Sequence, residues 1–152
     1  MPIKDAVTGA GAGLVAVLPM TGVMALVNSL LPERDQRALP PREISQKAAE
    51  KTGAGRPDDE ENLILTGFTH TGFSVAAGAL YGTIAGRVPI PPVASGVLFG
   101  VGVWAVSYLG WLPALRLYGT PEEQPKGRNA MMVIAHLVWG ASLGLAWGKR
   151  GR

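Results

Sequence analysis

The sequence predicts an all-α membrane protein built as a bundle of four transmembrane helices. Four stretches contain no Asp, Glu, Lys or Arg, and together they hold 100 of the 152 residues. Each is at least 20 residues long, which is about the length a helix needs to cross a bilayer core. Soluble helices keep a charged face and barrel strands alternate in polarity, so neither alternative fits. We therefore expect a single membrane domain over residues 1–152, with helices at about 7–31, 63–86, 93–115 and 129–148.

The first apolar stretch raises the question of a signal peptide. It is about twice as long as the apolar core of such a peptide, and no clear small-x-small cleavage site follows it. We therefore expect it to be a retained helix.

The polar loop over residues 33–61 is expected to contain a short helix. Leu39-Pro40 would begin it with Pro in the first turn, Glu43 and Lys47 are four residues apart in the favourable order, and Gly53 is a plausible stop. We expect this helix to lie at the membrane surface, and a docking site for a partner is the alternative. Four acidic residues then precede the second span. Asp58 and Glu61 have the spacing of a capping box, which favours a helix start over a metal site.

Glycines recur every fourth residue along the predicted helices. In lipid, such small residues let two helix backbones approach closely. We expect the faces to pack within one chain, and packing against a second copy is the alternative. The first helix carries Gly9 and Gly13, and the predicted helix-packing residues of the other three are Gly78, Gly82, Gly86, Gly96, Gly100, Gly140, Gly144 and Gly148.

Aromatic residues gather toward the ends of the predicted spans. Trp104, Tyr108, Trp111 and Tyr118 cluster toward one end of the third span. Since Trp and Tyr are enriched at membrane–water interfaces, we expect most of them to form interfacial belts.

The second and fourth helices share a motif. His70-x7-Gly78-x2-Tyr81-Gly82 matches His136-x7-Gly144-x2-Trp147-Gly148 at an offset of 66 residues, and both preceding helices end in Leu-Pro. The pattern indicates two repeated helical hairpins in the same orientation.

His70 and His136 are the candidate ligand residues. Apart from Tyr, they are the only ionisable side chains within the spans, and the repeat places them at one depth. Three interpretations stay open. The two imidazoles could be the axial ligands of a b-type haem, could bind copper together with a methionine, or could form ordinary hydrogen bonds between helices.

Composition limits the other functions. The chain has no Cys, which excludes disulfides and thiol chemistry, and no hydrolase or transferase constellation occurs, so we name no catalytic residue, no metal site and no firm cofactor. The basic residues are spread over connectors, which disfavours nucleic-acid binding despite the net charge of +3. We expect a non-enzymatic membrane protein whose partners are the lipid bilayer and a second copy or another membrane protein. A bis-histidine haem or electron carrier and a small oligomeric transporter or channel are the alternatives.

The distribution of Lys and Arg predicts an orientation. The first and third loops hold nine of these residues, whereas the tails and the second loop hold five. The positive-inside rule then places loops 33–61 and 116–128 in the cytoplasm and both termini outside. The basic tail over residues 149–152 argues for the reverse.

Several segments resemble a known group of proteins. They are 39–44, 76–82, 96–115 with Ser107-Tyr108-Leu109-Gly110-Trp111, 128–130 and 136–140. Together they resemble small YagU-like bacterial inner-membrane proteins of unknown function. The resemblance implies a multi-pass helical protein of the bacterial inner (cytoplasmic) membrane, and it carries over no catalytic residue.

Overall fold

The computed structural model describes residues 2–55 and 57–150, and every regular element within them is helical. Four helices are long and apolar enough to cross a membrane, over Ile3–Leu30, Glu60–Ala85, Pro92–Ala114 and Lys126–Lys149. The predicted all-α class with four spans is confirmed. The elements are α1 (Pro2–Leu30), the 3₁₀ turn η1 (Glu33–Asp35), α2 (Pro40–Lys51), α3 (Asp59–Ala85), α4 (Pro92–Val106), the π-helical segment η2 (Ser107–Trp111), α5 (Leu112–Ala114), the 3₁₀ turn η3 (Pro121–Glu123) and α6 (Lys126–Arg150).

Local signals set the helix boundaries in the polar loop. The Asp58 carboxylate accepts hydrogen bonds from the backbone N–H groups of Glu60 and Glu61, at 3.0 and 2.8 Å, and Glu61 accepts one from the Asp58 N–H at 3.3 Å. The predicted capping box is therefore confirmed, and it starts α3 four residues earlier than the apolar run predicts. The predicted loop helix is also present as α2, and Gly53 follows its end with a positive φ of 80°.

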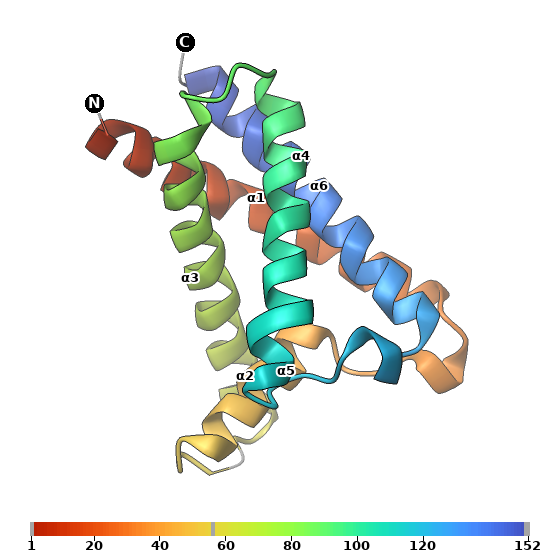
Figure 1. The fold of residues 1–152 in the computed structure, drawn as a ribbon. Coiled ribbons are helices and arrows are strands. Elements are labelled where there is room, and N and C mark those ends of the chain that lie inside the picture. The colour runs from red at the N-terminus through yellow and green to blue at the C-terminus, as the bar shows by residue number, and fades with distance from the viewer. Residues whose placement is uncertain (1, 56, 151–152) are drawn as a thin grey trace.

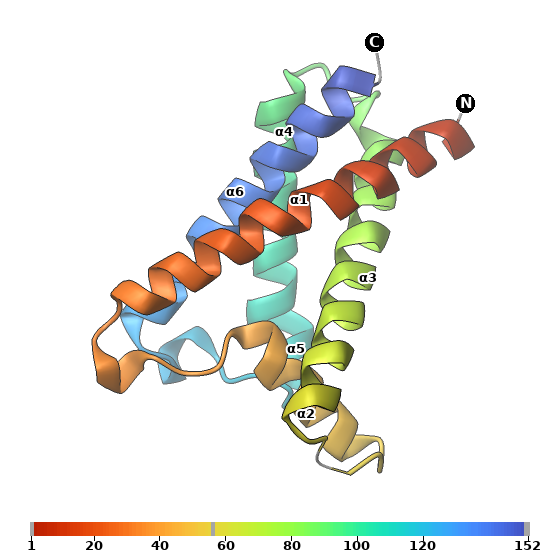
Figure 2. The same cartoon turned by 180° about the vertical axis from the view of Figure 1, so that it is seen from behind.

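The four spans alternate in direction. Both chain termini and the α3–α4 connection lie at one end of the molecule, called here the termini end, whereas α2 and α5 lie at the opposite loop end (Figure 1). Seen from behind, α1 and α6 run antiparallel beside one another as a tilted pair (Figure 2). The tails and the second loop therefore share one side, as four spans require.

Two glycine contacts hold the termini end together. A Cβ atom on Gly9 of α1 would collide with the Gly78 carbonyl oxygen and lie 2.8 Å from Gly82 Cα. In the same way, a Cβ on Gly96 of α4 would collide with the Gly140 carbonyl oxygen of α6 and lie 3.0 Å from Gly144 Cα. The helices of each hairpin therefore touch through their backbones.

The same pattern of glycine contacts occurs within each hairpin, but the equivalent residues are shifted by one helical turn from the predicted match. Gly13 faces the Ser74 carbonyl, and Gly100 faces the His136 carbonyl in the equivalent place. Residues of α3 and α6 that occupy equivalent places in the packing are therefore 62 residues apart in sequence, whereas the histidine motif predicts an offset of 66 residues. The difference arises because backbone approach, and not the histidine or aromatic match, sets the register of the crossing.

The last glycine of each predicted series lies outside these crossings. A Cβ on Gly86 would be in ordinary contact with the Trp147 ring, and one on Gly148 would lie 3.0 Å from the Pro92 side chain. The close backbone packing therefore depends on the two inner glycines of α3 and α6.

The two hairpins are not related by a full twofold arrangement. Antiparallel α1 and α6 pack along much of their length, whereas α3 and α4 have few contacts with one another. At the termini end, Tyr81 of α3 bridges this gap by donating a hydrogen bond to the Pro92 carbonyl at 2.9 Å. Farther toward the loop end, the ring centroids of Phe73 in α3 and Trp111 in η2 are 6.2 Å apart.

Candidate functional site

A cavity of about 240 Å³ lies between α3 and the loop-end half of the third span. All four spans contribute to its walls, and α2 contributes to its floor. Apolar and aromatic side chains predominate, among them Met20, Phe73, Trp111 and Trp139. A concave apolar site with a few polar groups is the usual form of a small-molecule pocket.

The cavity brings together the two histidines that the sequence analysis identified as ligand candidates. His70 and His136 both line it, from α3 and α6. Each lies ten residues after the first residue of its span, or about 15 Å along the helix. Since the hydrocarbon core of a bilayer is about 30 Å thick, both imidazoles lie near its middle.

The His136 ring has a defined hydrogen-bonding state. The side chain is 6% exposed, and its Nδ1 lies 2.8 Å from the Met132 carbonyl oxygen. A carbonyl can only accept, so Nδ1 carries the proton and donates. In a neutral imidazole the other nitrogen is then an acceptor. Among the described residues no donor reaches Nε2, and the ring is held edge-on to Tyr108, with centroids 5.8 Å apart.

The His70 ring has an unpartnered nitrogen. Its Nε2 atom is buried and has no hydrogen-bond partner in the part of the chain that the structure describes. An unpartnered buried polar atom costs about 1–3 kcal/mol. Two imidazoles whose Nε2 atoms have no hydrogen bond to the described residues therefore border one apolar space.

A hydrogen-bonded roof closes the cavity toward the termini end. The Trp139 indole N–H donates to Ser74 Oγ at 2.7 Å, and the Ser74 hydroxyl donates to the Gly13 carbonyl at 2.7 Å. Three of the four spans, α6, α3 and α1, are joined at this level. The roof lies one helical turn above His70, since Ser74 follows it by four residues.

The α2 helix forms the floor. Pro41, Ile44 and Ser45 line the cavity, and Ser45 Oγ lies 2.8 Å from Thr69 Oγ1 of α3. The last residue of α2, Lys51, donates to the Leu115 carbonyl at 2.8 Å. The predicted surface helix is therefore an integral wall of the site.

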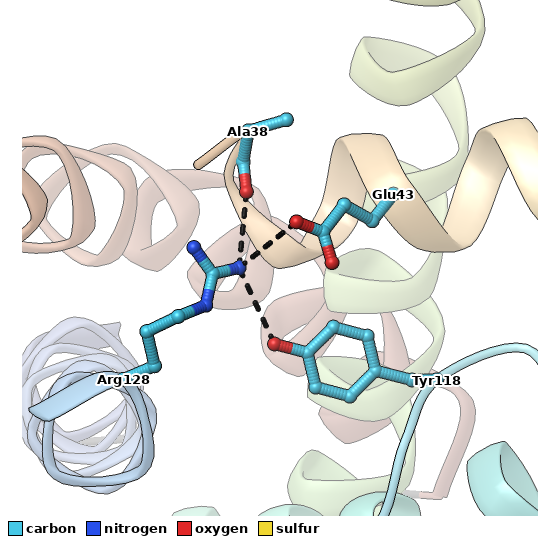
Figure 3. Close-up of polar contacts among 4 residues, drawn as sticks. All are labelled: Ala38, Glu43, Tyr118 and Arg128. Atoms are coloured by element: carbon cyan, nitrogen blue, oxygen red, sulfur yellow. Dashed lines mark hydrogen bonds and ion pairs between the residues drawn. The ribbon is translucent and has the colours of Figure 1, made fainter. Parts of the chain in front are cut away.

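A buried arginine fastens α2 to α6 (Figure 3). Arg128, in the first turn of α6, is 1% exposed, and its Nη2 donates to Ala38 O at 3.0 Å, Glu43 Oε1 at 3.1 Å and Tyr118 Oη at 3.4 Å. Its Nε and Nη1 are buried without a partner among the described residues. Burial raises the pKa of Tyr118, and the hydrogen bond and charge of Arg128 partly offset that rise.

A π-helical segment shapes the opposite wall. Over Ser107–Trp111 the third span widens by one residue, so that the Leu112 N–H donates to the Ser107 carbonyl five residues back. Pro113 follows directly, and proline disturbs the preceding helical turn. The widened turn directs Ser107, Tyr108 and Trp111 toward the cavity. Such π segments are often found at functional sites.

An aromatic pair separates the cavity from the outside. Phe73 and Trp111 line the cavity, yet are 45% and 37% exposed, and their ring centroids lie 6.2 Å apart. The pair therefore spans the gap between α3 and the third span at the depth of the bilayer.

The predicted interfacial belt is wrong for Tyr108 and Tyr118. The two side chains are 6% and 4% exposed and belong to the buried core. They are buried because each packs against a neighbouring aromatic ring, as in the contact of Tyr108 with Tyr118 at 5.4 Å.

Some site features have no clear signal in the sequence. In the sequence, Arg128 is indistinguishable from the other basic residues of the loops, and its partner Glu43 lies 85 residues away. Pro113 is a signal for helix distortion but does not specify a π turn. Among the described residues, no group of three or more His, Asp or Glu side chains could hold a metal ion.

Comparison with protein families gives a match over most of the chain. A family model described as "Protein of unknown function (DUF1440)" covers residues 20–145, which includes the whole cavity. No curated protein and no solved structure matches the chain.

Proposed function

We propose, given that this chain belongs to the DUF1440 family of proteins of unknown function, that it is a non-enzymatic membrane protein that holds a small lipophilic molecule between His70 and His136. The four spans make it a multi-pass membrane protein. The observation that carries the proposal is the pair of histidines from two helices on one apolar cavity. Among the described residues, His70 Nε2 is buried without a partner, and the hydrogen bond of His136 is made by Nδ1.

The size of the cavity limits the ligand. An apolar cavity of about 150 Å³ holds one benzene, and drug-sized ligands occupy about 300–1,000 Å³. At about 240 Å³, the space suits a molecule of one or two rings. It does not suit a haem, which is at least drug-sized. The roof also joins α3 to α6 one turn from the histidines, where a porphyrin would need the helices apart.

The closed roof and floor favour holding a molecule over passing one through. A channel or transporter needs a polar path from end to end, and the Ser74–Trp139 and Ser45–Thr69 contacts close the space on both sides. An oligomeric transporter therefore has less support than a binding protein.

Copper(I) is the second candidate ligand. Met20 and Met132 line the same cavity as the two histidines, and thioether sulfur with imidazole nitrogen suits this soft ion. Metal analysis of the purified protein tests it. A stoichiometric copper content that is lost in Met20→Leu would favour the metal over an organic ligand.

The location and partners of the protein complete the proposal. The YagU-like resemblance supports the bacterial inner membrane. The nine basic residues of the first and third loops support a cytoplasmic position for the loop end, with both termini outside. The glycines at the two crossings are used within the chain, so a second copy or another membrane protein would contact the lipid-facing surfaces instead.

The test uses bromobenzene, whose heavy atom quenches tryptophan fluorescence on contact. Trp111 and Trp139 line the cavity, so we expect quenching of the purified protein in nanodiscs to saturate. Val103→Phe should fill the cavity and abolish the saturable phase. Val101→Phe, on an exposed position of the same helix, is the matched control and should retain it. Quenching that rises linearly and identically in all three proteins would refute the proposal.

A further inference from the structure

We propose that the molecule held in the cavity carries a hydroxyl group on an aromatic ring, and that this hydroxyl donates its hydrogen bond to Nε2 of His136. The inference rests on the proposed function and specifies the ligand class. It follows from the protonation pattern of the two imidazoles and from what surrounds them.

His136 requires a donor from the ligand. Its Nδ1 proton is committed to the Met132 carbonyl at 2.8 Å, so Nε2 offers only a lone pair to the cavity. Ketones, ethers and esters have no proton to give to this atom. A hydroxyl does.

His70 can contact the same hydroxyl group through its oxygen, which accepts a hydrogen bond. Its Nε2 is buried and has no partner in the described residues. With the proton on Nε2, this ring donates to a ligand oxygen. A hydroxyl whose oxygen lies between the two rings would donate to His136 and accept from His70.

Three of the other hydroxyls that line the cavity are engaged within the protein. Ser45 is bonded to Thr69, and Ser74 is bonded to both Trp139 and Gly13. The walls are mostly apolar, so several polar groups of a ligand that carries many would have no partner in the cavity. A single hydroxyl is the better match.

The remaining surroundings favour a ring that arrives from the bilayer. Phe73, Tyr108, Trp111 and Trp139 line the cavity, and aromatic pairs in offset or edge-on contact gain about 0.5–1.5 kcal/mol beyond burial. Phe73 and Trp111 also form its lipid-side wall, with the rings in tilted contact. Movement of one of these side chains opens a path to the hydrocarbon core. A lipid-soluble phenol fits both observations.

The experiment compares three probes of similar size by saturable tryptophan quenching in nanodiscs. They are bromobenzene, 4-bromoanisole and 4-bromophenol, which have no oxygen, an oxygen without a proton, and a hydroxyl. Partitioning into the lipid is measured separately for each probe, and dissociation constants are referred to the lipid concentration. We expect 4-bromophenol to bind about tenfold more tightly than the other two, which should bind alike.

Variants assign the preference to one atom. His136→Phe should abolish the preference for 4-bromophenol and retain bromobenzene binding. His136→Gln, whose side-chain oxygen accepts a hydrogen bond, should restore part of it. His70→Phe should reduce the preference less, because it removes only the second contact.

The outcomes separate this inference from the proposed function. If the three probes bind alike, or if 4-bromophenol keeps its advantage in His136→Phe, the inference is overturned while the ligand cavity stands. Tighter binding of 4-bromoanisole together with 4-bromophenol would also overturn it, since the ligand oxygen would then be accepting. If no probe gives a saturable phase, the proposed function itself fails. The comparison of probes on the wild-type protein decides even where a variant does not fold.

Discussion

The termini end of the bundle is packed backbone against backbone, whereas the loop end is packed through side chains around a cavity. At the termini end, Gly9 meets Gly78 and Gly96 meets Gly140, with no room for a Cβ atom between them. At the loop end, the contacts include hydrogen bonds and the ion pair of the buried Arg128, made by residues such as Arg128, Ser45 and Trp139.

The difference shows how a small membrane protein can be rigid and hollow at once. Close crossings at one end hold each hairpin as a unit, so the bundle needs few direct contacts between α3 and α4. The cavity between α3 and the third span is bounded on one side by α2, which lies outside the apolar spans. Four predictions test this division, and each gives a change in the free energy of unfolding.

The largest effect should come from Gly140→Ala at the α4–α6 crossing. The added methyl group would collide with the Gly96 backbone, and it cannot be accommodated unless the helices separate. We expect a loss of about 3 kcal/mol, although Ala favours helix over Gly by about 1 kcal/mol. Thermal and SDS-induced unfolding followed by tryptophan fluorescence measures it.

Gly102→Ala is the matched control for this crossing. It lies on the same third span as Gly96, and a Cβ atom added there would have nothing within 4 Å. It should leave stability unchanged or slightly raised. Equal stability of the two variants would show that backbone contact does not hold the termini end.

The next largest effect should come from Glu43→Gln at the loop end. The change removes the carboxylate that is bonded to the buried Arg128 guanidinium, so the charge is left with neutral acceptors. We expect a loss of about 2 kcal/mol. Asp35→Asn is the control, because its partner Arg34 is 86% exposed and such pairs contribute at most about 1 kcal/mol. If both variants lose the same amount, Arg128 does not fasten α2.

The two ends also differ in how far the sequence predicts them. Charge exclusion from the hydrocarbon core reveals the four spans, and small residues at four-residue spacing point to helix-packing faces. The capping box at Asp58 is a local signal, and the structure confirms it. These features depend on neighbours along the chain or on the lipid, so one sequence is sufficient to find them.

The loop end depends on contacts between distant residues. Sequence spacing singles out His70 and His136, but the cavity that they line is formed by residues of all four spans and of α2. The burial of Arg128 requires Glu43 and Ala38 from another helix and its preceding loop, and charge counting treats that arginine as solvated. The predicted repeat offset is wrong by one turn because the histidine motif resembles a packing register without setting it.

A smaller effect should come from Ser74→Ala at the boundary between the two regions. The variant removes the acceptor of the Trp139 N–H and the donor to the Gly13 carbonyl. We expect a loss of about 1 kcal/mol, because hydrogen bonds between membrane helices are individually modest. In a Trp139→Phe background the loss should shrink, since one of the two bonds is already gone.

Ser29→Ala serves as the control for Ser74→Ala. Its hydroxyl is exposed and bonds to the Leu26 carbonyl of its own helix, so its removal should have little effect on stability. A loss in Ser74→Ala no greater than in Ser29→Ala would mean that the roof does not couple the two ends.

The smallest effect should come from Asp58→Ala, at the loop end of α3. The variant removes the acceptor for the N–H groups of Glu60 and Glu61 in an exposed first turn, so we expect a loss of about 0.5 kcal/mol. Amide hydrogen exchange should become faster over residues 60–64, while the amides after Ser74 stay protected by the glycine crossing. Asp58→Asn keeps a capping oxygen and should exchange like the wild type. Faster exchange along the whole of α3 would mean that the two ends of the helix open together, and the division between a rigid termini end and a separately held loop end would then be wrong.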